Sequence, residues 1–314
     1  MLTMLGFFNE LRLGIEITPL ALRMGLLARN GASSSVLGTC QPPLAAGMVA
    51  ETFAALNIKD REGLAELLRA GLKSLGAHSV RRAGLSLPDG IFRVQTIEFD
   101  DLPKHHRDRD RLVRWRVEKG AAFDASSTVL RYQVYPRSDR GCTVLACVAK
   151  KEIIAQYEDL LSGVGLEPWI VTPSSFNAVN FYGPYLAGKD IPSFALAWVT
   201  ESSYTTIIME QGVPRFYRYK EIKAGGAPAD VTVRLIRELD DSLHFYLHMD
   251  RQQQSEVEHL YLAGEPVVVA SLSESLKKET TLAVETLLPG AVLASVPEAA
   301  SPLAAAFGAG GVLS

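Results

Sequence analysis

Two similar hairpin patterns, one in each half of the chain, limit the folds that this sequence can adopt. Residues 11–17 (LRLGIEI) and 20–28 (LALRMGLLA) are short alternating runs separated by Thr18-Pro19, which predicts a β-hairpin. From Ser193 the runs FALAWVTES, YTTIIMEQG and VPRFYRYKEI follow the same order. The order of elements repeats while the residues do not, so we expect two lobes of related topology.

Between the hairpins, the sequence predicts the rest of a first lobe and a separate α+β segment. A strand at Ser34–Cys40, a helix after Lys59-Asp60 and a strand at Arg82–Leu87 belong to the first lobe. Pro88-Asp89-Gly90 then ends that strand in a turn. The stretch that follows has the pattern of a strand, a helix, two strands and a helix, which is typical of a compact α+β subdomain inserted into a larger fold.

After the second hairpin, the sequence predicts two helices, a strand and a tail of small residues. A long helix covers about residues 228–250, with Asp230 as its N-cap. Its apolar stripe comprises Val233, Ile236, Leu239, Leu243, Tyr246 and Leu247. A strand ends at Gly264, and residues 271–288 are predicted to form a helix. The tail PLAAAFGAGG lacks bulky groups, so it forms either a final helix close to its neighbours or a flexible end.

The composition is that of a globular protein without a strong charge of either sign. Apolar residues make up 47% and charged residues 21% of the 314 residues, and the net charge is −3. A charge so close to neutral provides no basic field for nucleic acid or for an anionic bilayer. No apolar run is long enough to cross a membrane, and the three cysteines are too few for a disulfide framework. These observations favour a cytoplasmic protein that does not bind nucleic acid.

Several longer strings point to a family. They are LGIEI at 13–17, GLSLPDGIFRVQTIEFDDLP at 84–103, LVRWRVEKGAAFD at 112–124, VLACVAKKEIIAQYEDLLSGVGLEPWIV at 144–171 and RLIRELDDSLHFYLH at 234–248. In this order they resemble the PilM family of type IV pilus assembly proteins, which is related to FtsA. The resemblance implies an α/β fold of the actin-like (ribonuclease H-like) type, with two lobes and an inserted small α+β subdomain. The expected boundaries are 1–87 for the first lobe, completed by about 172–190, then 88–171 for the insert and 191–314 for the second lobe.

The resemblance also implies a function. Members of the family are cytoplasmic scaffolds of a type IV pilus, or of a related type II secretion machine. They bind the N-terminal cytoplasmic tail of a PilN-like inner-membrane protein, and this partner alone holds them at the membrane. A homodimer is compatible with the sequence. The alternative from another class is a sugar or small-molecule kinase with the actin-like fold, which needs an intact phosphate site and a catalytic carboxylate.

The family's nucleotide site lies between its lobes, at two hairpin turns whose amides approach the phosphates and whose acidic residues hold Mg²⁺. Here Glu16 stands where the family has an aspartate, and Thr18 takes the place of a glycine. Pro19 removes an amide donor. In the second turn, which follows Ala197, the acidic residue is missing or displaced to Glu201.

Three glycines complete the candidate nucleotide site. Gly264 stands where the family has a Gly-Gly pair near the adenine and ribose, but Glu265 adds a negative charge beside it. Gly225-Gly226, before the long helix, is the best remaining phosphate candidate, and a plain turn is the alternative. The predicted cofactor-binding residues are therefore Glu16, Thr18, Gly225, Gly226 and Gly264, with no catalytic residue and no metal ligand. We expect ATP with Mg²⁺ to bind weakly or not at all, and hydrolysis to be absent.

One aromatic residue of the insert has two interpretations. Arg114, Trp115 and Arg116 cannot share one face of a helix. Trp115 therefore packs into the inserted subdomain, which we favour, or it lies at a rim where a partner peptide binds.

Overall fold

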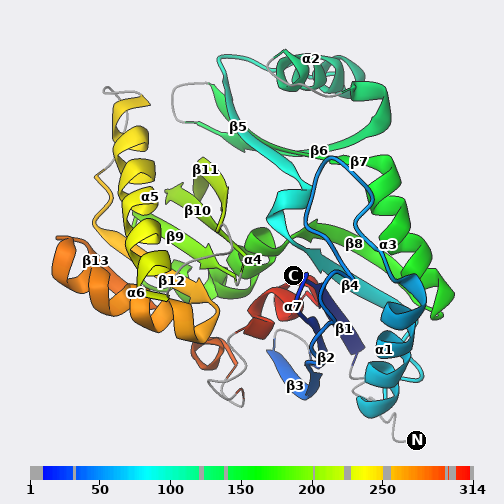
Figure 1. Ribbon diagram of the computed structural model, residues 1–314. Coiled ribbons are helices and arrows are strands. Elements are labelled where there is room, and N and C mark those ends of the chain that lie inside the picture. Colours follow the sequence, from blue (N-terminus) through cyan, green and yellow to red (C-terminus); the bar gives the residue numbers. More distant parts are fainter. Residues whose placement is uncertain are drawn as a thin grey trace, which may run out of the picture. The chain divides into compact units, whose positions relative to one another are not determined.

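The chain folds around two five-stranded sheets that have the same strand order (Figure 1). The structure is a computed structural model that describes residues 10–30, 33–119, 124–137, 141–200, 202–222, 228–249, 256–293, 296 and 302–311. The chain divides into two units, each of which contains one of these sheets. Unit 1 comprises residues 1–88, 155–189 and 288–314, and unit 2 comprises residues 89–154 and 190–287.

Unit 1 is built on a mixed sheet with the order β3-β2-β1-β4-β8. Its elements are β1 (Glu10–Ile17), β2 (Leu22–Asn30), β3 (Ser33–Cys40), α1 (Arg61–Ser74), β4 (Arg82–Leu87), β8 (Glu167–Pro173), α4 (Ser174–Ala187), η3 (Pro289–Ala291) and α7 (Ala304–Ala309). The first three strands are antiparallel neighbours, whereas β4 runs parallel to β1 and β8 runs parallel to β4. Helix α3 (Lys151–Gly163) begins in unit 2 and ends in unit 1.

Unit 2 contains a second mixed sheet, with the order β11-β10-β9-β12-β13, and a three-stranded antiparallel sheet, β5-β7-β6. Its elements are η1 (Asp89–Ile91), β5 (Arg93–Phe99), α2 (His106–Glu118), η2 (Ala125–Ser127), β6 (Thr128–Pro136), β7 (Cys142–Lys150), β9 (Ser193–Val199), β10 (Ser203–Glu210), β11 (Val213–Glu221), α5 (Pro228–Met249), β12 (His259–Gly264), α6 (Pro266–Glu279) and β13 (Ala283–Thr286). In the five-stranded sheet, β12 runs parallel to both β9 and β13. The repeated topology predicted from the two hairpins is therefore confirmed.

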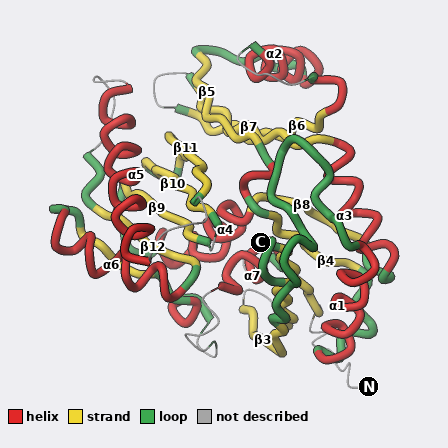
Figure 2. Tube along the Cα trace, in the orientation of Figure 1, coloured by secondary structure: helices red, strands yellow, loops and turns green. Residues whose placement is uncertain are grey.

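Helices cover both faces of the sheet in unit 1 (Figure 2). Met24 on β2 contacts α1 at Gly71, whereas a Cβ on the next residue, Gly25, would meet the ring of Phe307 on α7. Because neighbouring residues of a strand point to opposite faces, α1 and α7 lie on opposite sides of the sheet. Helix α4 lies beside α7, and the rings of Phe181 and Phe307 have their centroids 5.7 Å apart.

The contact between α7 and the sheet is made by backbone atoms. A Cβ on Gly14 of β1 would overlap the carbonyl oxygen of Ala306, and a Cβ on Gly84 of β4 would overlap that of Ala309. These two glycines are opposite each other in the parallel pair β1–β4. On the other side of α7, a Cβ on Gly308 would overlap the carbonyl oxygen of Asn177 on α4. Small residues on both surfaces therefore allow α7 to lie between the sheet and α4.

Of the two interpretations of the Ala- and Gly-rich tail, a final helix or a flexible end, the structure shows the helix, which packs close to its neighbours. Residues 288–314 thus belong to unit 1, although they were predicted to lie in the second lobe. Residues 155–171, predicted to lie in the insert, also belong to unit 1. The reason is that α3 is tied to this unit, since the Gln156 side chain accepts a hydrogen bond from the Asn57 amide at 2.8 Å.

Helix α5 differs from its prediction in its start and in its buried face. It begins at Pro228, so Asp230 lies inside the first turn and is not the N-cap. The side chains of Leu235, Leu239 and Tyr246 are buried in the core of unit 2. In contrast, the predicted stripe residues Val233 and Leu247 are 48% and 43% exposed. Apolar residues occur on more than one side of this helix, and only the sheet that it packs on decides which side is buried.

The helix predicted for residues 271–288 is only partly present. Helix α6 ends at Glu279, and β13 follows from Ala283 to Thr286. The apolar residues Leu282 and Val284 of this segment pack against the core of unit 2. Their spacing of two is the strand period, which the helix prediction missed because helix-forming residues surround it.

The insert has the predicted order of strand, helix, two strands and helix, and side chains of β11 fasten it within unit 2. The guanidinium of Arg215 lies 3.1 Å from carboxylate oxygens of both Glu98 and Glu210, and 3.0 Å from the hydroxyl oxygen of Thr143. The Tyr217 hydroxyl donates a hydrogen bond to Asp89 at 2.7 Å. The alternating basic and aromatic residues of β11 therefore have a structural role.

Two further features concern disulfide bonds and membrane-spanning helices. Cys40, Cys142 and Cys147 are all free thiols. Within the part of the chain that the structure describes, no helix combines the length and the apolar character needed to cross a bilayer.

The backbone contact of α7 leads to a first prediction. Replacing Gly14 with alanine forces α7 away from β1, so the free energy of unfolding should fall by about 3 kcal/mol. Gly183→Ala is the matched control, because no atom lies within 4 Å of a Cβ at this position in α4. In a helix interior this change should stabilise by about 0.5–1 kcal/mol. Urea denaturation followed by circular dichroism measures both, and equal transitions would contradict the proposed contact.

Candidate functional site

The turn between β1 and β2 is closed by the side chain of Thr18. Its hydroxyl oxygen accepts hydrogen bonds from the amides of Leu20 at 3.3 Å and Ala21 at 3.0 Å. The Thr18 amide donates to the Ala21 carbonyl at 2.9 Å, and Pro19 has no amide hydrogen. Every amide of residues 18–21 is therefore absent or engaged within the turn, so none is available to a phosphate without breaking an internal bond.

Glu16, the candidate carboxylate for Mg²⁺, is buried in an ion pair. Its side chain is completely inaccessible to solvent, and a carboxylate oxygen lies 3.3 Å from the Arg23 guanidinium, which is also buried. The two residues are opposite each other in the β1–β2 hairpin. A fixed cation already neutralises this carboxylate, which makes it a poor partner for a hydrated metal ion.

The turn between β9 and β10 in unit 2 uses a threonine in the same way. The Thr200 hydroxyl oxygen accepts hydrogen bonds from the amides of Ser202 at 3.3 Å and Ser203 at 3.0 Å. The Thr200 amide donates to the Ser203 carbonyl at 2.8 Å. Glu201, one of the two alternatives for the acidic residue of this turn, lies outside the described residues. Thr18 and Thr200 thus make matching hydrogen bonds in the two related hairpins.

Gly264 has a structural explanation in the strand pair β9–β12. Its φ is +124°, and a Cβ at this position would overlap the carbonyl oxygen of Val199. The next amide, of Glu265, donates to that same carbonyl at 2.9 Å. The remaining phosphate candidates, Gly225 and Gly226, lie outside the described residues. Among the predicted cofactor-binding residues that are described, each is therefore engaged in hydrogen bonding or packing of its own hairpin or sheet.

Sequence reasoning missed Arg23 and Thr200, although both leave a signal. A turn over residues 18–21 places residue 17 opposite 22, and thus Glu16 opposite Arg23. A threonine directly follows the first strand of each hairpin, in IEIT and in AWVT. Threonine hydroxyls commonly bond to backbone groups of a turn, so this repeated position could have indicated a closed turn in both halves.

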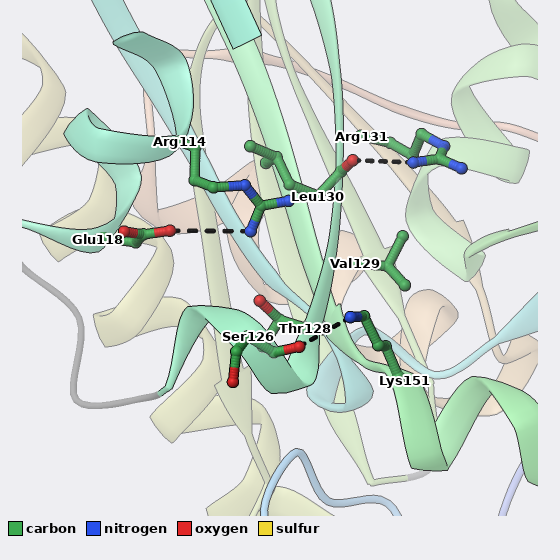
Figure 3. A pocket seen from close by; sticks show the side chains of 8 residues that line it. All are labelled: Arg114, Glu118, Ser126, Thr128, Val129, Leu130, Arg131 and Lys151. Atoms are coloured by element: carbon green, nitrogen blue, oxygen red, sulfur yellow. Dashed lines mark hydrogen bonds and ion pairs between the residues drawn. The ribbon is translucent and has the colours of Figure 1, made fainter. Parts of the chain in front are cut away.

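A groove runs along the outer edge of β6 in unit 2 (Figure 3). It consists of two adjoining hollows of about 550 and 690 Å³, which share Arg114, Leu130 and Arg131. Arg114 belongs to α2 and the other two residues to β6. We call it the β6 edge groove. In the described part of the chain, β6 pairs only with β7, so its other side is an open strand edge.

The helix that borders this groove carries an exposed tryptophan. Trp115 is 54% exposed, and the Lys119 ammonium lies 5.2 Å from its ring centroid. The favoured prediction, that Trp115 packs into the insert, is therefore wrong. Val113 and Val117 are the residues of α2 that are buried instead.

Within the described residues, no group of three or more His, Cys, Asp and Glu side chains is placed to hold a metal ion. His244 and His248 on α5 are four residues apart, but a ring nitrogen of His248 instead contacts the carbonyl oxygen of His244 at 2.7 Å.

The fold is similar to that of known actin-like proteins. The chain matches a solved structure described as the PilM–PilN type IV pilus biogenesis complex with a TM-score of 0.81 and 19% identity, over 95% of this chain and 97% of that chain. A protein of Bacteroides thetaiotaomicron with an actin-like ATPase fold matches with a TM-score of 0.52 and 12% identity, over 91% and 94% of the two chains. The ethanolamine utilization protein EutJ of Carboxydothermus hydrogenoformans matches with a TM-score of 0.51 and 9% identity, over 97% and 90%. No family model and no curated protein matches the sequence significantly.

These likenesses establish that the chain has the actin-like fold, as the sequence predicted. At such low identities they establish the fold alone. The two sheets with their shared strand order, and the small sheet β5-β7-β6 of the insert, are the elements that carry this fold here.

The closed turns predict weak nucleotide binding. Because the amides of both turns are engaged by threonine hydroxyls, a triphosphate must break these bonds, at a cost of about 1 kcal/mol each. Isothermal titration with MgATP should therefore give a dissociation constant above about 100 μM. Saturable binding in the low-micromolar range would contradict this expectation.

The ion pair in unit 1 leads to a third prediction. Arg23→Met leaves the Glu16 carboxylate buried without its guanidinium partner, so the free energy of unfolding should fall by about 3 kcal/mol. Changing both residues, as Glu16→Leu with Arg23→Met, removes the buried charge and should recover most of this loss. Urea denaturation measures both variants. A double variant that is less stable than Arg23→Met would show that the pair is not the relevant interaction.

Proposed function

We propose that this protein is a non-enzymatic scaffold that binds the cytoplasmic tail of a PilN-like inner-membrane protein. It would connect this partner to a type IV pilus or to a related secretion machine. The observation that carries the proposal is the likeness in fold to the PilM–PilN complex, which extends over 95% of the chain and so includes the insert. The other two matches reported above have lower TM-scores, of 0.52 and 0.51.

The chemistry of the two hairpin turns supports a binding role over a catalytic one. A kinase with this fold needs free amides at the turns and a carboxylate that can hold Mg²⁺. Here Thr18 and Thr200 engage the turn amides, and Glu16 is paired with Arg23. The kinase alternative therefore has no feature of the described residues in its favour.

The mode of binding that we propose is capture of an extended peptide. Main-chain hydrogen bonds would supply affinity, and apolar pockets for alternate side chains would supply register. The protein would be held at the inner membrane through this partner, in the cytoplasm, without a spanning segment of its own in the part of the chain that the structure describes.

Fluorescence anisotropy tests the proposal. A labelled synthetic peptide with the sequence of the N-terminal tail of the PilN-like protein from the same organism should bind saturably, with a dissociation constant in the micromolar range. A scrambled peptide of the same composition is the control and should not bind. The affinity should not change when MgATP is added, because the tail does not require a nucleotide. Equal affinity for the two peptides, or release of ADP when sugars are supplied, would overturn the proposal.

A further inference from the structure

The outer edge of β6 has the shape of a site for an added strand. Side chains from both faces of the strand line the groove, with Leu130 toward Arg114 and α2, and with Val129 and Arg131 on the other face (Figure 3). Because residues from both faces of β6 line this groove, the groove runs along the edge of the strand. Backbone groups of an extended peptide can pair with such an edge, while its alternate side chains meet the two faces.

The acidic groups of the groove are engaged by its own side chains. Glu118 pairs with Arg114 at 3.7 Å on α2. Asp110 accepts a hydrogen bond from the Tyr132 hydroxyl, and its other oxygen lies 3.1 Å from His106. The Arg109 guanidinium also donates to the Tyr132 hydroxyl oxygen, at 3.3 Å. On the α2 side, charges are therefore balanced within the groove.

Two cations on the other side of β6 donate hydrogen bonds to backbone carbonyls. The Arg131 guanidinium donates to the Leu130 carbonyl at 3.1 Å, and the Lys151 ammonium donates to the Ser126 carbonyl at 2.7 Å. Among the described residues, no carboxylate lies within ion-pair distance of either cation.

Lys151 does have an acidic neighbour, Asp124, whose pKa is lowered first by hydrogen bonds from Ser126 and then by the Lys151 ammonium. Arg131 has no such neighbour among the described residues, so it is the stronger candidate for an added carboxylate. A backbone carbonyl is a weaker acceptor than a carboxylate, so an incoming carboxylate can displace it. Val129 provides an apolar contact on the same face of the strand.

We propose that the β6 edge groove binds an acidic, extended segment of a protein partner, which adds to β6 as a fourth strand of the small sheet. Its same-face side chains would alternate carboxylate, apolar and carboxylate, to meet Arg131, Val129 and Lys151. Cross-strand neighbours on one face are close enough for such pairs. The inference goes beyond the proposed function and does not depend on it, because it rests on the charges and the open edge of unit 2 alone.

The blocking of β6 by its own cations is the competing structural explanation. Charged side chains at a strand edge often serve to prevent pairing with other chains. In that case, an added strand should gain nothing from carboxylates, and the two cations should not discriminate between acidic and basic peptides. The sign of the peptide charge therefore separates the two explanations.

The probe is the labelled heptapeptide TEVVVET, with acetylated and amidated ends, and its control is TKVVVKT. Fluorescence anisotropy with the full chain should detect binding of the acidic peptide and at least tenfold weaker binding of the basic one. Arg131→Gln and Lys151→Gln should each weaken binding of the acidic peptide by about threefold. Lys277→Gln, at an exposed position of α6, is the matched control and should leave the affinity unchanged. Circular dichroism confirms that each variant is folded.

A second peptide tests the strand pairing itself. Methylation of alternate backbone nitrogens of TEVVVET removes main-chain donors without changing its charge. Methylation of those nitrogens whose N–H groups would pair with β6 should abolish binding.

Equal binding of the acidic and basic peptides, or full affinity in both glutamine variants, would overturn the inference. A dimer of the protein that the heptapeptide dissociates, as measured by light scattering, would also overturn it and assign the edge to a second copy of this chain. The PilN-like tail should not displace the bound heptapeptide, because we infer that the two peptides bind at different sites. A failure of the heptapeptide to bind can therefore be distinguished from a failure of the PilN-like tail to bind.

Discussion

The backbone of α7 rests directly on β1 and β4 at Gly14 and Gly84, and the rest of unit 1 is arranged around that contact. A helix on a sheet is normally held at a distance by side chains, which interdigitate across the gap. Here the gap is removed, and α4 can close over α7 because Gly308 is also without a side chain. The Phe307 ring, which lies against Gly25, fills the space that remains beside the strands. The small residues of this segment are thus a requirement of close packing.

The two hairpins share one fold, and in each of them the described backbone amides of the turn are hydrogen-bonded within the turn itself. In each of them a threonine directly follows the first strand, and its hydroxyl oxygen accepts from the amides two and three residues further on. Such a turn needs no ligand to satisfy its backbone, because the side chain replaces the acceptor that a phosphate would be. Arg23 plays an equivalent role for Glu16, since it supplies a fixed positive charge beside the buried carboxylate.

Periodicity and turn residues predicted most of the fold. Pro19 marks the turn of the first hairpin and Pro88 the end of the strand at Arg82–Leu87, so these ends were readable, and α1 begins directly after Lys59-Asp60 as expected. The prediction failed where a local pattern is compatible with two structures. Leu282 and Val284 fit a helix or a strand, and the exposed Val233 differs from the buried Leu235 only in what lies opposite. At the candidate site, the partners of Glu16 and Thr18 were not predicted, because hydrogen bonds of a turn depend on its conformation and not on residue type alone.

The chain enters unit 1 three times, and this affects the order in which the protein can be completed during synthesis. The strands that contain Gly14 and Gly84 are translated before unit 2, but the helix that covers them is translated after it. The glycine-lined face of the first sheet therefore stays uncovered until α7 has been synthesised, and apolar surface that is exposed during such an interval is prone to aggregation.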